Sequence, residues 1–76
     1  MEQSDLGIFC ENIKWLRAKH NLSKQKMAQM LHISVRTLNR IEQGDVPPRI
    51  SVEPLYWIYD HFGILPSEIL GRHLNE

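Results

Sequence analysis

The sequence predicts a compact all-α domain of five short helices. Apolar residues recur at intervals of three and four in five segments, which is the spacing of helices with one buried face. Serine, glycine and proline separate the segments, and no segment shows the two-residue alternation of a strand. A chain of 76 residues suffices for one such unit, so we expect residues 1–76 to form a single domain without a separate catalytic part.

The first three helices are expected at about residues 6–20, 24–31 and 35–43. Ser23 and Ser34 can each cap the helix that follows, because a serine hydroxyl accepts a hydrogen bond from an unpaired N–H of the first turn. Gly44 would end the third helix, since glycine readily adopts the left-handed conformation found there. The side chains expected in the shared core are Phe9, Ile13, Leu16, Met27, Ala28, Leu31, Ile33, Leu38 and Ile41.

The last two helices are expected in the C-terminal third of the chain. One would run from a Ser51 cap to Phe62, with Pro54 in its first turn, where a missing N–H costs little. Pro66 would open the other, which would stop at Gly71. The side chains expected to be buried on these helices are Leu55, Ile58, Tyr59, Phe62, Ile69 and Leu70.

Charge is distributed very unevenly along the chain. Residues 12–41 contain seven basic side chains and no acidic one, whereas the rest of the chain contains two basic and nine acidic side chains. A DNA duplex meets only one face of a small protein, so the local field matters more than the net charge of zero. The central stretch therefore favours DNA binding.

Residues 22–44, with the sequence LSKQKMAQMLHISVRTLNRIEQG, resemble the Cro and phage-repressor type of helix-turn-helix domain. The small Ala28 lies where the two helices of such a motif cross, and Ser34 caps the second helix. The similarity extends to IKWLR at 13–17 and to FGILPSEIL at 62–70, so it covers roughly residues 8–71. The resemblance implies a repressor-like regulator with its motif at 23–43, which binds double-stranded DNA sequence-specifically through helix 35–43 in the major groove.

The family's docking mode implies which residues meet DNA. Arg36 and Arg40 lie one turn apart, and each could form a two-pronged contact with guanine. The expected base contacts, taken as exposed, are Val35, Arg36, Asn39 and Arg40. The expected contacts to the DNA backbone are Ser23, Lys24, Gln25, Ser34, Thr37, Gln43 and Arg49.

The resemblance also implies an ion pair between Arg17 and Glu42 that orients the recognition helix, the alternative being two solvated charges. Four positions depart from the family pattern. His32 replaces the usual turn glycine and would need a left-handed backbone, and Lys24 stands where the family often has glutamine. Asp45 lies where relatives often have basic residues, and Leu65 replaces a capping serine.

Several aromatic residues are not required for a core. Trp15 and Trp57 fall at exposed helix positions, and Tyr56 does so in part. Regulators of this type usually bind two half-sites as dimers, so we expect a homodimer through residues 51–74 with Tyr56, Trp57 and Leu74 at the interface. The alternative is that Trp57 packs against the N-terminal arm or the tail.

No enzyme, cofactor or metal site is expected. The sequence lacks a glycine-rich phosphate loop, metal-ligand spacing and a Ser-His-Asp arrangement, and Cys10 is a lone, half-buried thiol. No apolar run approaches the ~18 residues of a membrane span, and the acidic N-terminus does not resemble a secretory signal, so a cytoplasmic location is expected. A second hypothesis is that the same fold serves as a protein–protein interaction module or an antitoxin-like partner protein.

Overall fold

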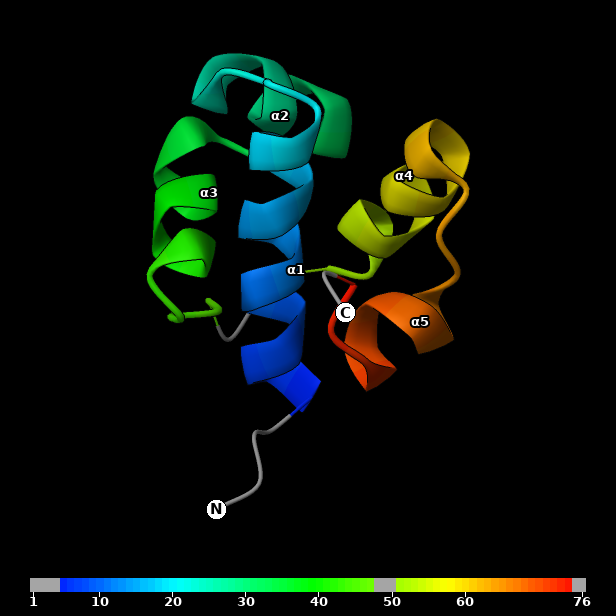
Figure 1. Ribbon diagram of the computed structural model, residues 1–76. Helices are drawn as coiled ribbons and strands as arrows, with labels where there is room; N and C mark the ends of the chain where they lie inside the picture. Colours follow the sequence, from blue (N-terminus) through cyan, green and yellow to red (C-terminus); the bar gives the residue numbers. More distant parts are fainter. Residues whose placement is uncertain (1–4, 48–50, 75–76) are drawn as a thin grey trace.

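The computed structural model describes residues 5–47 and 51–74, which form five helices and no strand: α1 (Asp5–Lys19), α2 (Lys24–Leu31), α3 (Val35–Glu42), α4 (Glu53–Phe62) and α5 (Pro66–Gly71). In Figure 1, α1 runs through the middle of the domain, with α3 on one side and α5 on the other. Helix α1 packs against α3 and α5, whereas α2 packs against α3 and α4. The predicted all-α, five-helix fold is confirmed. None of the described helices is long and apolar enough to cross a lipid bilayer.

A single apolar core joins all five helices. Its fully enclosed side chains come from every helix and are Phe9, Cys10, Ile13, Leu16, Met27, Ala28, Leu31, Leu38, Ile41, Ile58 and Ile69. Leu55, Phe62 and Leu70 are half-buried against this core. Cys10 is more deeply buried than the sequence suggested, with 3% of its surface exposed, and Trp15 is half-buried rather than exposed.

The buried face of α4 differs from the prediction. Tyr59, expected in the core, is 51% exposed. The enclosed residues Pro54 and Ile58 are four positions apart and define a narrow stripe. Tyr59 is turned about 100° from Ile58 around the helix axis, which places it outside the stripe. The prediction assumed a wider apolar face than the neighbouring helices cover.

Four helix boundaries also differ by one position. Helix α1 begins at Asp5 and ends at Lys19, one residue earlier at each end than predicted. Helix α4 begins at Glu53, and its N-cap is Val52 rather than Ser51. The Ser51 hydroxyl still accepts a hydrogen bond from the Glu53 N–H at 3.3 Å. The serine therefore pairs an N–H of the first turn, although it lies one residue before the N-cap. Helix α3 ends at Glu42, and Gln43 is its C-cap.

One buried polar side chain, Asn12, connects α1 to the C-terminal segment. Its Nδ2 donates to the carbonyl oxygens of Ile69 at 2.9 Å and Arg72 at 2.8 Å. Its Oδ1 accepts from the backbone N–H of Leu74 at 2.9 Å. The amide thus satisfies carbonyls at the end of α5, which the helix itself cannot pair, and fixes the following tail against α1.

Candidate nucleic-acid interface

Helices α2 and α3 both begin with a capped and exposed N-terminus. The Ser23 hydroxyl accepts from the Lys26 N–H at 3.0 Å, and the Ser34 hydroxyl accepts from the Thr37 N–H at 3.0 Å. Both serines have extended backbone angles, as an N-cap requires. The remaining N–H groups of each first turn give these helix ends a partial positive charge that suits a phosphate.

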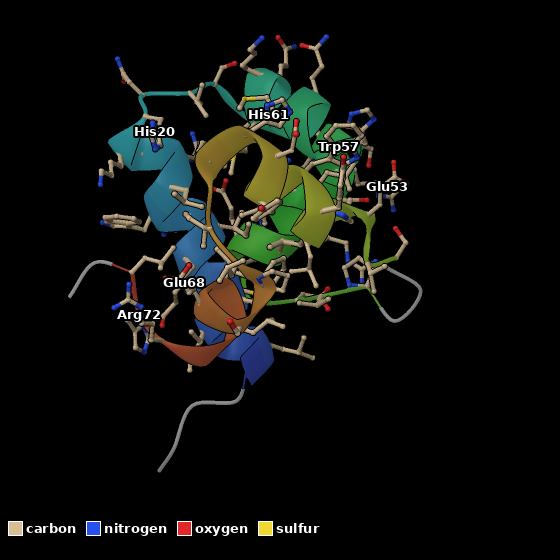
Figure 2. The ribbon with its side chains drawn as sticks, turned by 90° about the vertical axis from the view of Figure 1, so that its right-hand side faces the viewer. His20, Glu53, Trp57, His61, Glu68 and Arg72 are labelled. Carbon is tan, nitrogen blue, oxygen red and sulfur yellow. The ribbon has the colours of Figure 1, made fainter. Side chains whose placement is uncertain are left out.

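The turn between the two helices is made by His32. Its φ of 59° and ψ of 41° confirm the left-handed conformation predicted for this position. The imidazole stacks on the Trp57 indole with ring centroids 4.1 Å apart and planes inclined by 12°. Trp57 Nε1 donates to Glu53 one turn earlier on α4, at 3.3 Å (Figure 2). The histidine that replaces glycine therefore attaches the turn to α4.

The outer surface of α3 carries the side chains expected to contact bases, with different exposures. Val35 and Arg36 are exposed, as expected. Asn39 and Arg40 are half-buried rather than exposed, because α3 packs against both α1 and α2 and its flanks are partly covered. The Asn39 Oδ1 is buried without a hydrogen-bond partner among the described residues. The structure thus brings Val35, Arg36 and Arg40 to one surface, and Asn39 lies on the same side of the helix, between Val35 and Arg36.

Arg17 and Glu42 form a two-pronged ion pair on the inner side of α3. Arg17 Nε lies 2.6 Å from Glu42 Oε2, and Nη2 lies 2.9 Å from Oε1. Nη1 donates to the Leu22 carbonyl at 3.2 Å, so the same guanidinium also fixes the loop before α2. The hydrogen bond to Glu42 raises the pKa of Arg17 despite partial burial. This pair fixes the C-terminal end of α3 to α1, and its members are not solvated surface charges.

A second arginine–carboxylate pair lies at the outer side of the same helix end. Arg40 Nε donates to Asp45 Oδ2 at 3.0 Å. The side chains of Arg40 and Asp45 are 43% and 61% exposed, compared with 23% and 6% for Arg17 and Glu42. Asp45 therefore neutralises part of the positive charge that was expected to face DNA.

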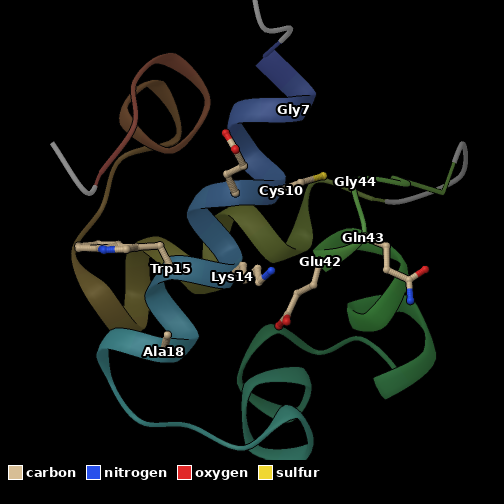
Figure 3. A pocket seen from close by; sticks show the side chains of 9 residues that line it. Gly7, Cys10, Lys14, Trp15, Ala18, Glu42, Gln43 and Gly44 are labelled. Atoms are coloured by element: carbon tan, nitrogen blue, oxygen red, sulfur yellow. The ribbon is translucent and has the colours of Figure 1, made fainter.

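An open groove of about 590 Å³ separates α1 from the end of α3 (Figure 3). Its lining residues are Gly7, Cys10, Glu11, Lys14, Trp15, Ala18, Glu42, Gln43 and Gly44. Burial raises the pKa of the Cys10 thiol, and the carboxylates of Asp45 and Glu11 raise it further. The groove contains acidic and basic groups together, so it does not extend the positive surface of α3.

The described residues expected to contact the DNA backbone occupy three places: the start of α2, the start of α3 and the position after α3. Ser23, Lys24 and Gln25 are exposed around the start of α2, and Gln43 is exposed after α3. The Ser34 hydroxyl also donates to Thr37 Oγ1 at 2.9 Å, so these two are paired with each other. Arg49 lies outside the described residues.

The three residues expected at a dimer interface do not form one exposed set. Tyr56 is exposed, whereas Trp57 and Leu74 are half-buried. Trp57 packs on the His32 turn. Residues 1–4 of the N-terminal arm and residues 75–76 of the tail, the alternative contacts, lie outside the described residues. The Leu74 side chain packs against the core, and its backbone N–H donates to Asn12. The spacing pattern gave no signal for the stack with His32, because it depends on two segments far apart in the chain.

Comparison with known proteins gives one result. A protein-family model described as helix-turn-helix matches residues 13–53, which run from the middle of α1 to the start of α4. No curated protein and no solved structure gave a match. The matched segment contains both capped helices, the turn and the Arg17–Glu42 pair, and it covers more than half of the chain. The chain therefore belongs to the Cro/CI-type helix-turn-helix family of DNA-binding domains.

Proposed function

We propose that this protein is a repressor-like transcriptional regulator that inserts α3 into the major groove of double-stranded DNA and binds a specific sequence. The observation that carries the proposal is the pair Arg36 and Arg40, one turn apart on the outer side of α3, while Leu38 and Ile41 fix the inner side in the core. Each guanidinium can donate two hydrogen bonds to O6 and N7 of guanine, a contact worth about 1–3 kcal/mol of discrimination.

Two further residues would complete the base contacts. The exposed methyl groups of Val35 suit the methyl group of thymine. Asn39 suits an adenine edge, which accepts and donates in the same pattern as an amide. The Oδ1 of Asn39 has no hydrogen-bond partner in the described part of the chain, which supports this assignment, since an amide that turns toward DNA would gain one.

Phosphate contacts would come from the starts of α2 and α3 and from the segment after α3. The exposed N-terminus of α2 offers N–H groups, hydroxyl, ammonium and amide donors within one turn. These contacts would set the position of the protein along the duplex without selecting a sequence. The residues assigned to them are Ser23, Lys24, Gln25, Ser34, Thr37, Gln43 and Arg49.

Fluorescence anisotropy of a labelled duplex tests this proposal. Affinity is measured at about 50 and about 200 mM salt for the wild type, Arg36→Ala, Arg40→Ala and Arg72→Ala, the last removing a charge from the exposed end of α5. Six or more phosphate contacts would lower the affinity about a thousandfold between these salt concentrations. Arg36→Ala and Arg40→Ala should weaken binding more than Arg72→Ala does.

Absence of binding at the lower salt concentration would contradict the proposal. The fold would then serve the second hypothesis, a protein–protein interaction module or an antitoxin-like partner protein. Equal losses in all three variants would mean that DNA meets the charge of the whole domain and not the outer side of α3.

We also propose that the protein acts as a homodimer through residues 51–74. The surface that supports this is a shallow apolar groove over α4 and the α4–α5 connection, lined by Val52, Leu55, Tyr56, Tyr59, Leu65 and Pro66. Four of these side chains are large and exposed, which makes a surface suited to a partner. A two-fold dimer would double the number of base contacts and match two half-sites one helical turn apart.

Light scattering after size exclusion tests the dimer. The wild type should have twice the chain mass, and a Tyr56→Gln/Tyr59→Gln variant should have the monomer mass. Asp60→Asn changes an exposed α4 residue outside the groove and should leave the dimer intact. A wild-type monomer at high concentration, or a dimer that survives the tyrosine substitutions, would contradict this interface.

A further inference from the structure

An acidic residue, Asp45, follows the end of α3 and lies beside a proposed base contact, and we infer that Asp45 is a positioning residue for Arg40. Asp45 would hold the Arg40 guanidinium so that its two terminal nitrogens point outward. This would increase the preference of the protein for the base that Arg40 contacts over the other bases. The inference deepens the proposed function and rests on it. It concerns how the site selects a sequence and which residue outside the recognition helix takes part.

The chain places Asp45 beside Arg40 through the cap that ends α3. Gly44 has a φ of 87°, which reverses the chain after Gln43. The Gly44 N–H then bonds to the Ile41 carbonyl at 2.9 Å, and the Asp45 N–H bonds to the Arg40 carbonyl at 2.8 Å. This pair of hydrogen bonds is the Schellman arrangement, which returns the second residue after the cap to the last helical turn.

In such caps the returning residue commonly makes an apolar contact with the helix, and here it makes an ion pair. The backbone bond and the side-chain bond join the same two residues, so Asp45 is fixed at both ends. The backbone at the end of the helix therefore fixes the position of the Asp45 carboxylate.

The geometry of the pair determines which atoms of Arg40 remain available. Asp45 Oδ2 accepts from Nε at 3.0 Å. No hydrogen bond to either terminal nitrogen of Arg40 is found among the described residues. A guanidinium held at Nε presents its two terminal nitrogens as one edge, and that edge matches the two acceptors of guanine. Fixing a long side chain before binding also lowers the entropy that binding must overcome.

Arg36 provides an internal comparison one turn earlier on α3. It is exposed, and no ion pair of its side chain is found in the described parts of the chain. If Asp45 only weakened the positive field, the bases contacted by Arg36 and Arg40 would be affected alike. If Asp45 positions Arg40, only the base contacted by Arg40 should depend on it.

The acidic residue also has an expected cost in affinity. A carboxylate near the phosphate backbone repels it, so Asp45 should weaken binding to every sequence by a similar factor. Positioning predicts that removal of the carboxylate strengthens binding to a random duplex and lowers discrimination. A carboxylate that merely sequestered Arg40 would instead lower both specific and random binding, and its removal would strengthen specific binding the most.

The experiment begins with selection of bound sequences from a randomised duplex by the wild-type protein. Affinities are then measured for the selected duplex and for every single-base change in it. The proteins compared are the wild type, Arg36→Ala, Arg40→Ala, Asp45→Ala, Asp45→Asn and the Asp45→Ala/Arg40→Ala double variant. Asp60→Ala is the control, because it removes an exposed carboxylate from α4. Circular dichroism verifies the fold of each variant.

Arg40→Ala should reduce the preference for one guanine by about tenfold or more. Asp45→Ala should reduce the same preference by about three- to tenfold, without change at the base lost in Arg36→Ala. The double variant should discriminate like Arg40→Ala alone, because Asp45 acts only through that arginine. Asp45→Asn, which keeps an oxygen acceptor, should retain part of the preference, and Asp60→Ala all of it.

Three results would overturn the inference. One is full discrimination in Asp45→Ala, another is an equal change at all positions, and the third is a gain in specific binding larger than the gain in random binding. Failure to enrich any sequence with the wild type would instead contradict the proposed function itself, so the two failures can be told apart.

Discussion

Helix α3 has an arginine–carboxylate pair on each side, and the two pairs differ in nearly every physical respect. The inner pair, Arg17 and Glu42, has two parallel contacts and a carboxylate that is only 6% exposed. The outer pair, Arg40 and Asp45, has one contact, and its carboxylate is 61% exposed. Burial strengthens a charge pair and makes loss of one partner costly, whereas solvent screens the exposed pair.

The same contrast holds for the polar contacts of the whole domain. Asn12 is enclosed between α1 and the C-terminal segment with all three of its hydrogen bonds directed inward. His32 and Glu53, by contrast, lie on the outer surface beside Trp57. We therefore expect the inner polar contacts to determine stability and the outer contacts to affect binding or local order. The following predictions test this division.

The largest effect on stability is expected from Asn12→Ala. The substitution leaves the Ile69 and Arg72 carbonyls and the Leu74 N–H without their partner. Unpaired buried groups cost about 1–3 kcal/mol each and are not additive, so a total loss of about 3 kcal/mol is expected from urea unfolding. Gln29→Ala, an exposed amide on α2, should change the free energy of unfolding by less than about 0.5 kcal/mol.

Hydrogen exchange adds a local readout to the Asn12 prediction. The Leu74 amide should exchange much faster in Asn12→Ala, because its acceptor is the Asn12 oxygen. Equal stability of Asn12→Ala and Gln29→Ala would show that the tail is held by apolar packing alone.

The next effect separates the two ion pairs. Glu42→Ala should lower the free energy of unfolding by about 2 kcal/mol, because it leaves the partly buried Arg17 guanidinium without its carboxylate. Asp45→Ala should lower it by about 0.5 kcal/mol or less, since its pair is exposed. A double-mutant cycle with Arg17→Met measures the inner coupling directly. Similar losses in Glu42→Ala and Asp45→Ala would contradict the division between inner and outer contacts.

The sequence was sufficient to predict the helix-turn-helix half because its signals are local. Ser23 and Ser34 cap within three residues, and the apolar spacing of α2 and α3 matches the side that is buried. The position of His32 also follows from its neighbours in the chain. Such signals do not depend on distant segments, so helices α2 and α3 were located to within one residue.

The C-terminal half was predicted less well because its contacts are remote in sequence. Asn12 and its partners are separated by 57 to 62 residues, and a single polar residue in an apolar helix face gives no sign of its acceptors. The exposure of Tyr59 and the stack of Trp57 on His32 likewise depend on how α4 packs on α2. The pairing of Asp45 with Arg40 is local in sequence, but it was not predicted because it depends on the cap geometry at Gly44.

A smaller effect is expected at the turn, where two terms oppose each other. His32→Gly should relieve a left-handed backbone that costs a non-glycine residue about 1 kcal/mol, but it removes the stack on Trp57, worth about 0.5–1.5 kcal/mol. These terms nearly cancel, so the stability of His32→Gly should be close to that of the wild type. His32→Ala keeps the strain and loses the stack, and it should be about 1 kcal/mol less stable than His32→Gly. Thermal unfolding measures this order, and equal stability of the two variants would contradict the cost assigned to the backbone.

The smallest effect is a pH dependence that originates at Cys10. Burial raises the pKa of this thiol above its ordinary value in the folded protein, with Asp45 and Glu11 adding to the shift. The unfolded chain therefore loses the thiol proton first as pH rises, so stability is fully present below the ordinary thiol pKa. Above that pH, stability falls until the folded protein also ionises.

Urea unfolding at pH 7 and pH 10 measures this effect in the wild type and in Cys10→Ala. The wild type should lose more stability than the variant between the two pH values, by at most about 1.4 kcal/mol for each pH unit above the ordinary thiol pKa. Asp45→Asn should reduce the difference only slightly, because burial is the larger cause of the shift. If Asp45→Asn abolished the pH dependence, the charge of Asp45 would determine the pKa of the buried Cys10 thiol. That result would contradict the division between inner and outer contacts.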